Sequence, residues 1–233
     1  MTISITVPGV TFTKFVGKVL MPFIDEASAF YLFGGDAASS TKNMALGATI
    51  NGSVIAAPTY GAGFANASHV NGFNTGFVMP SPYTQIIVSQ WVSGDVALLG
   101  RGNGNADNFW QMLTAELTGT SLAEWPNGKG QNISGLSLGS SFMMQGARWG
   151  GGGTKDNVFV RTGTGLLSVS NSVNQTNSQG TPTNTLKVGT GYGPGTFKVA
   201  VVMLIPRVLT DAELVQVYDY LKPLLASRSV TMA

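Results

Sequence analysis

Short apolar stretches alternate with polar turns along the middle of the chain, residues 46–206. The turns are rich in glycine and asparagine, as at Asn51-Gly52 and Gly163-Thr164-Gly165. Such residues supply the positive φ that tight turns need. Many short strands separated by turns predict an antiparallel sandwich or barrel. The strand-length apolar stretches lie at 86–88, 96–99, 109–113, 136–144, 158–161 and 166–169.

The closing segment has the clearest pattern. Residues 197–205 are almost continuously apolar, which is typical of a strand buried on both faces. Thr210 and Glu213 then match the Thr-x-x-Glu capping box of a helix start. The pattern predicts one amphipathic helix over 211–225, docked on the sandwich, with Pro223 near its end. Its apolar stripe consists of Leu214, Val217, Tyr218, Leu221 and Leu225.

Composition narrows the class of protein. Charged residues make up 10% of the chain, against about 25% in ordinary domains. Hydrophobic residues at 43% exclude a disordered chain, and a net charge of +2 gives no electrostatic footprint for nucleic acid. The absence of cysteine excludes disulfides, thiolate nucleophiles and Cys-ligated metal sites. A glycine-rich, all-β protein with a neutral surface is expected.

The first part of the chain differs from the rest. We expect residues 1–45 to form an attachment or adaptor segment, with a short helix over Asp25–Tyr31, and residues 46–228 to form the sandwich. The apolar run 19–24 is too short for a secretory signal, and no stretch reaches the length of a membrane span. We therefore expect synthesis in the cytoplasm without a signal peptide and no membrane insertion.

Residues 197–214, with Val217 to Leu221, resemble the end of laminin-G-like, concanavalin A-type jelly rolls. In that family the last strand leads into an Arg-x-Leu-Ser/Thr-x-x-Glu helix start, which here is Arg207 to Glu213. Residues 57–64, 72–76, 83–88 and 186–189 are similar to its earlier strands, so the resemblance covers roughly residues 43–228. It implies a concanavalin A-like β-sandwich with one C-terminal helix.

Glycine- and asparagine-rich, cysteine-free domains of this style are frequent in tail fibres, tailspikes and other virion proteins of bacteriophages. The resemblance therefore implies a phage virion protein on the tail or capsid surface, made in the host cytoplasm. It also implies a homo-oligomer, by analogy a trimer, with other virion proteins and a host surface glycan as partners.

Sequence motifs that would indicate an enzyme active site are hard to find in this chain. Hydrolases of this fold carry Glu-x-Asp-x-x-Glu on one strand, which this chain lacks, and Glu116 with Glu124 is the nearest alternative pair. His69 is the only histidine, and no serine lies in a Gly-x-Ser-x-Gly elbow. We expect no catalysis.

No cofactor is expected either. A calcium site built from loop aspartates is left open, because some lectin-like domains bind calcium through Asp and Asn oxygens. The candidates are Asp95, Asp107 and Asp156, although no Asp-x-Asp-x-Asp array is present.

Aromatic and amide side chains are the better candidates for ligand contact. Sugar rings stack on aromatic faces and amides bond hydroxyls, although tryptophans also serve in cores and subunit interfaces. The favoured function is host-glycan binding by a non-catalytic virion protein. A capsid decoration protein without sugar binding and a polysaccharide depolymerase are the alternatives. The candidate ligand residues are Trp125, Trp149, Arg148, Tyr60, Tyr192 and Asn127.

Overall fold

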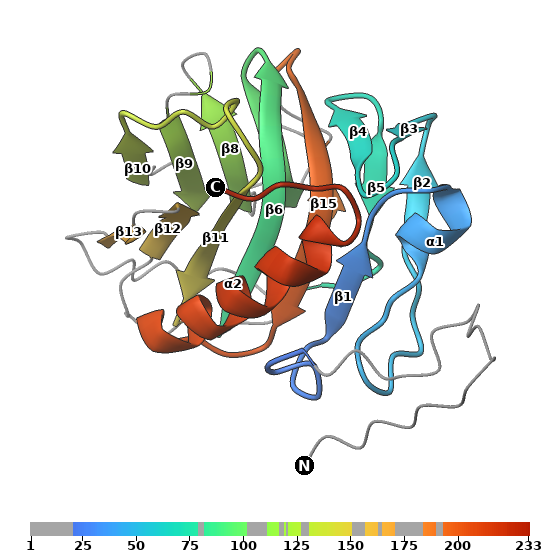
Figure 1. Cartoon of the computed structure of the whole chain (residues 1–233), viewed down its shortest axis with the longest axis horizontal. Helices are drawn as coiled ribbons and strands as arrows, with labels where there is room; N and C mark the ends of the chain where they lie inside the picture. The colour runs from blue at the N-terminus through green and yellow to red at the C-terminus, as the bar shows by residue number, and fades with distance from the viewer. Residues whose placement is uncertain are drawn as a thin grey trace, which may run out of the picture.

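The computed structural model describes residues 21–78, 82–101, 111–116, 119, 121–126, 131–150, 157–162, 165–170, 184–189 and 193–233. In these ranges the chain forms two antiparallel sheets (Figure 1). Sheet A runs in the order β13-β12-β11-β6-β15-β4-β3, and β1 also pairs with β15. Sheet B runs β10-β9-β8-β7-β14-β5-β2.

The strands of sheet A are β1 (Ala29–Leu32), β3 (Thr59–Tyr60), β4 (Ala65–Ser68), β6 (Tyr83–Ser93), β11 (Met143–Trp149), β12 (Asn157–Thr162), β13 (Gly165–Ser170) and β15 (Thr196–Ile205). Those of sheet B are β2 (Ser53–Ile55), β5 (Gly72–Asn74), β7 (Val96–Arg101), β8 (Gln111–Glu116), β9 (Ser121–Pro126), β10 (Gln131–Ser134) and β14 (Lys187–Val188). The helices are α1 (Ala37–Thr41) and α2 (Asp211–Ala226).

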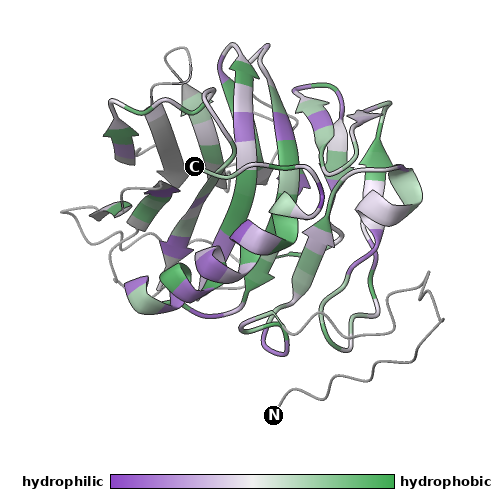
Figure 2. Cartoon of the chain, viewed as in Figure 1, coloured by the Kyte–Doolittle hydropathy of each residue, from purple (hydrophilic) through white to green (hydrophobic). Residues whose placement is uncertain are grey.

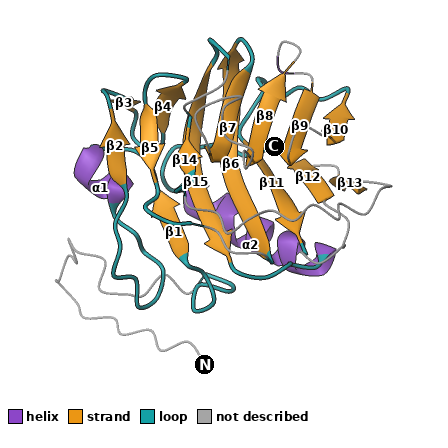
Figure 3. Cartoon of the chain, turned by 180° about the vertical axis from the view of Figure 1, so that it is seen from behind, coloured by secondary structure: helices purple, strands orange, loops and turns teal. Residues whose placement is uncertain are grey.

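Sheet A separates two hydrophobic cores. One core lies between the two sheets and includes Tyr31, Ile87 and Phe197. The other lies on the outer face of sheet A, where α2 packs over Ile86 and Met203. Figure 3, seen from behind, shows α2 on the far side of the sheets. The fold is therefore a jelly-roll β-sandwich with a helix as a partial third layer, as the sequence predicted.

The two cores explain the apolar run that ends in β15. Residues 201–205 are fully buried because their alternate side chains enter the two cores in turn. Burying each such side chain contributes about 1.5–3 kcal/mol. The prediction of a strand buried on both faces is confirmed for this half of β15.

The start of α2 also confirms the sequence prediction. Thr210 accepts a hydrogen bond from the Glu213 backbone N–H, and the Glu213 carboxylate accepts one from the Thr210 backbone N–H. All five residues of the predicted stripe are buried. Pro223 does not end the helix, which continues to Ala226 because Leu225 is buried in the outer core.

The segment before the sandwich is joined to it. The predicted helix over Asp25–Tyr31 is wrong: residues 29–32 form β1, which pairs with residues 201–204 of β15. All four residues of β1 are buried, so tertiary pairing decides their conformation. The attachment role of residues 1–45 stays a prediction, and residues 1–20 lie outside the described part.

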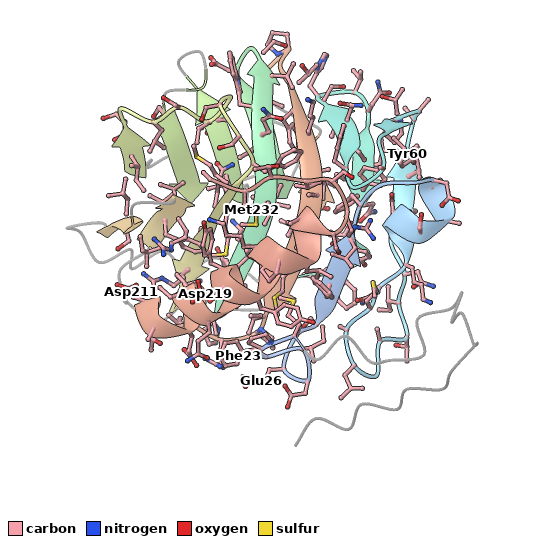
Figure 4. All side chains as sticks on the ribbon, viewed as in Figure 1. Phe23, Glu26, Tyr60, Asp211, Asp219 and Met232 are labelled. Atoms are coloured by element: carbon pink, nitrogen blue, oxygen red, sulfur yellow. The ribbon has the colours of Figure 1, made fainter. Side chains whose placement is uncertain are left out.

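The last residues of the chain cross the outer face of sheet A. Met232, labelled in Figure 4, forms a bridge with Phe142, and the Ala233 N–H donates to the Phe142 carbonyl at 2.9 Å. Together with α2, this C-terminal segment covers only part of that face. In the described residues, neither helix is long and apolar enough to span a bilayer.

Candidate functional site

Four polar residues lie in register across the part of sheet A that α2 leaves uncovered. Thr59 on β3 lies opposite Asn66 on β4, which lies opposite Lys198 on β15, which lies opposite Gln90 on β6. We call these four residues the polar row. Neighbouring strands lie about 4.8 Å apart, so the row spans about 14 Å.

Strand alternation places the polar row on the outer face. Phe197 and Val199 flank Lys198 and point into the core between the sheets, as do Ala65 and Ala67 beside Asn66. Thr59 is exposed and the other three members are partly exposed. In Figure 2, hydrophilic residues appear on β6, β15 and β4 beyond the C-terminal segment.

A β-bulge marks where the apolar half of β15 becomes the polar half. Val199 lies opposite Ser89 and Val201 opposite Val88, so Ala200 is the extra residue. The Ala200 carbonyl accepts a hydrogen bond from the Phe33 N–H at 2.9 Å. The bulge therefore lets one strand present buried apolar residues under α2 and a lysine beyond it.

Local hydrogen bonds hold the two amides of the polar row. Asn66 Nδ2 donates to Thr59 Oγ1 at 2.9 Å, and Gln90 Nε2 donates to the Gly139 carbonyl at 2.8 Å. Among the described residues, Asn66 Oδ1 and Gln90 Oε1 accept no hydrogen bond. Both carbonyl oxygens can therefore accept from the hydroxyl groups of a ligand.

Lys198 supplies the charge of the row. Its Nζ lies 5.2 Å from the centre of the Phe64 ring, close enough for a cation–π contact. It makes no ion pair with a carboxylate in the described part of the chain. Val92 lies two residues after Gln90, at a second register shift between β6 and β15, and is 48% exposed.

Of the residues predicted to touch a ligand, Tyr60 is directed into the sandwich. Its ring meets Phe73 edge-on at 6.3 Å, in the core between the sheets (Figure 4). Its buried hydroxyl has no hydrogen-bond partner in the described residues. Burial raises the pKa of this phenol, and the charge of Asp36 raises it further. Tyr60 is next to Thr59 in sequence but faces the other way.

Arg148 is held under the start of α2. Its Nη1 donates to the Leu209 carbonyl at 2.9 Å and pairs with Asp211 at 2.7 Å. Its guanidinium lies 5.7 Å from the centre of the Phe159 ring. These contacts use Arg148 within the fold, and a ligand role for it stays a prediction.

The other predicted ligand residues are placed only in part. Trp125 lies on β9 opposite Met112, and Trp149 ends β11 opposite Tyr83, but both side chains lie outside the described part of the structure. Asn127 and Tyr192 also lie outside the described residues. A ligand role for these four residues stays a prediction.

The candidate acid residues lie on neighbouring strands of sheet B. Glu116 lies opposite Ser121, whereas Glu124 lies opposite Leu113, three positions along β8. The side chains of both glutamates lie outside the described part of the structure. His69 is an exposed turn residue after β4.

The predicted calcium ligands are not gathered in the described ranges. Asp95 lies in the β6–β7 turn, where its carbonyl accepts from the Gly195 N–H at 2.9 Å. Asp107 and Asp156 lie outside the described residues. Within the described ranges, no group of three or more His, Cys, Asp or Glu residues could hold a metal ion.

A small pocket lies where α1 meets the edge strands. Its cavity volume is about 10 Å³, room for about one water molecule, against about 300–1,000 Å³ for typical small-molecule sites. Tyr31, one of its lining residues, donates its hydroxyl to the Thr75 carbonyl at 2.7 Å. The pocket holds at most a small group, and the polar row offers the more extended set of polar atoms.

Comparison with known proteins identifies the fold. No protein-family model and no curated protein sequence matches the chain. Among solved structures, it is similar to Trypanosoma rangeli sialidase in complex with sialic acid, with a TM-score of 0.61 and 10% identity over 83% of this chain. The match spans 32% of the sialidase chain, about a third of its length.

Two further structures share the fold. Domain 4 of an extracellular arabinanase from Geobacillus stearothermophilus, in complex with arabinotriose, matches with a TM-score of 0.56 and 13% identity, over 84% of this chain and 98% of that domain. The binding domain of botulinum neurotoxin serotype D matches with a TM-score of 0.60 and 8% identity, over 87% of this chain and 52% of that one. These likenesses show a β-sandwich fold.

Proposed function

We propose that this chain is a non-catalytic β-sandwich that binds a polysaccharide through the polar row. The observation that carries the proposal is the row itself, in which amide oxygens and an ammonium group share one partly exposed face of a sheet. A sugar presents hydroxyls that donate and accept hydrogen bonds, which this mixture can pair. Because Asn66 and Gln90 are already held, binding costs little side-chain entropy. The arabinanase domain with bound arabinotriose supports the idea that a similar sandwich holds an oligosaccharide.

The sequence supports binding without cleavage. Glycoside hydrolysis needs two carboxyl groups flanking one bond, and this chain lacks the Glu-x-Asp-x-x-Glu array that hydrolases of this fold carry. A depolymerase would release reducing ends from a host polysaccharide and would lose that activity in Glu116→Gln or Glu124→Gln. We expect no release by the wild-type protein.

The proposed setting is the surface of a phage particle, and it rests on the sequence resemblance. A receptor-binding tail or surface protein would bind host cells, whereas a capsid decoration protein would bind purified heads and no cell surface. Binding measured against both targets distinguishes these two roles.

The binding proposal is tested on an array of bacterial surface polysaccharides. We expect the wild-type protein to bind at least one polymer, and Asn66→Ala to weaken that binding by about tenfold, the effect of one hydrogen bond of roughly 1.4 kcal/mol. Gln216→Ala removes an exposed amide from α2 and should bind as the wild type does. No binding to any polymer, or equal binding by wild type and Asn66→Ala, would contradict the proposal.

A further inference from the structure

We infer that the polar row recognises an acidic polysaccharide and holds a sugar carboxylate against the Lys198 ammonium. The inference rests on the proposed function and deepens it by naming the class of glycan. It starts from the position of one cation in this charge-poor chain. Lys198 is the charged member of the polar row, and no carboxylate pairs with it in the described ranges. Lys42, Lys222 and Arg228 also have no carboxylate partner there, but they lie outside the row.

The surroundings of Lys198 hold its charge at the surface without neutralising it. The ammonium stands 5.2 Å from the centre of the Phe64 ring, which itself packs against Phe142 at 5.8 Å. Phe64 is therefore anchored in the outer core while the ammonium stays next to solvent. A ring face attracts a cation but leaves its N–H donors available for a ligand oxygen.

The neighbours of Lys198 complement a carboxylate-bearing sugar. Asn66 and Gln90 lie directly opposite it on the two adjacent strands, each about 4.8 Å away. Their Oδ1 and Oε1 atoms accept hydrogen bonds, whereas the ammonium only donates. A uronate sugar offers the matching pattern, because it carries one carboxylate and several hydroxyl donors on the same ring.

A charged ligand gains more from this site than a neutral one. A hydrogen bond between ammonium and carboxylate is roughly twice as strong as one between neutral groups. Nucleic acid is also anionic, but its binding relies on several cations meeting several phosphates. The polar row has one cation and the whole chain a net charge of +2, which favours a sparsely charged polysaccharide.

The test uses an array in which each uronate-containing bacterial polysaccharide is printed beside its carboxyl-reduced form, together with single-stranded DNA. We expect wild-type protein to bind acidic polymers and to lose about tenfold or more in affinity for their reduced forms. Lys198→Gln should show the same loss on the acidic polymers, and Lys198→Arg should restore most of the binding. Raising the salt from about 0.1 M to 1 M should weaken the wild type but not Lys198→Gln, because the Debye length falls from about 10 Å to 3 Å.

Lys42→Gln is the matched control. Lys42 is exposed directly after α1 and is not a member of the polar row, and its loss changes the net charge by the same amount. Thermal unfolding of each variant checks that the fold is kept. Binding to neutral polymers alone would overturn the inference while leaving the proposed function standing, and no binding at all would remove both. Equal losses in Lys42→Gln and Lys198→Gln, or tighter binding to DNA, would show a non-specific charge effect and would also overturn it.

Discussion

Arg207 is the residue that connects the start of α2 to the beginning of the described chain. Its guanidinium pairs with Glu213 at 2.8 Å and with Glu26, and it lies 5.0 Å from the centre of the Phe23 ring (Figure 4). The hydrogen bond from Arg207, helped by the Thr210 N–H, lowers the pKa of Glu213 from 4.5 to about 2. Glu213 therefore caps the start of α2 and also pairs with Arg207.

A pH-dependent contribution to stability follows from that lowered pKa. A carboxyl with a lowered pKa in the folded state stabilises the fold above its unfolded pKa and loses this contribution as the pH falls. We expect Glu213→Gln to be less stable than the wild type by about 1 kcal/mol at pH 7, with the difference shrinking as the pH falls from 4.5 to about 2.

Urea unfolding of both proteins across this pH range measures the effect. Glutamine can still accept the capping hydrogen bond, so the comparison isolates the charge. A stability difference that stays constant over the whole range would contradict the role given to the Glu213 charge.

At the scale of single residues, the sequence predicts what is local. Thr210 and Glu213 lie three positions apart, so the capping box follows from their spacing alone. The contact of Arg207 with Glu26 joins residues far apart in the chain, and no local sequence pattern predicts it. The same holds for Arg148, whose partners Leu209 and Asp211 belong to a different part of the sequence.

At the scale of elements, α2 covers part of the outer face of sheet A. Leu221 is fully buried in the outer core, so Leu221→Ala should lower the free energy of unfolding by about 2–5 kcal/mol. Gln216→Ala, on the exposed side of the same helix, should change it by less than about 0.5 kcal/mol.

Chemical denaturation of the two helix variants tests this packing. Because both substitutions introduce alanine in the same helix, a change in helix propensity affects each in a similar direction. Equal stabilities for Leu221→Ala and Gln216→Ala would show that α2 does not seal a core.

Elements were predictable where local pattern and tertiary burial agree. The closing strand and helix satisfy both conditions, and their prediction is confirmed. The apolar stretch 136–144 was expected to be a strand, but the strand begins at Met143, after a bend at Gly135, which has φ 74°, and a turn at residues 138–140. Leu136 and Leu138 are buried from a loop, and a periodicity argument cannot separate them from strand residues.

The polar row could not be read from the sequence. Its four members are ordinary residues at positions 59, 66, 90 and 198, and only the antiparallel register brings them together. One signal was available: Lys198 interrupts the apolar run that leads into residues 199–205. Its importance depends on where α2 stops covering the sheet, and only the tertiary structure shows this.

At the scale of the whole molecule, the proposed function depends on α2 covering only part of the outer face of sheet A. Between the sheets the core is continuous, and the second core under α2 stops near the bulge at Ala200. The ion pairs of Arg148 and Arg207 gather at the start of α2. The uncovered part of the face carries amides, hydroxyls and one ammonium, a surface suited to adhesion. The expected homotrimer and virion location remain predictions.

The most direct test of glycan binding through the polar row is an NMR titration of isotope-labelled protein with a fragment of the polysaccharide that binds best on the array. We predict that the side-chain NH₂ resonances of Asn66 and Gln90 shift in proportion to bound ligand, that those of Gln216 stay in place, and that no reducing ends form. Shifts confined to other parts of the protein, with Asn66 and Gln90 unchanged, would contradict the account.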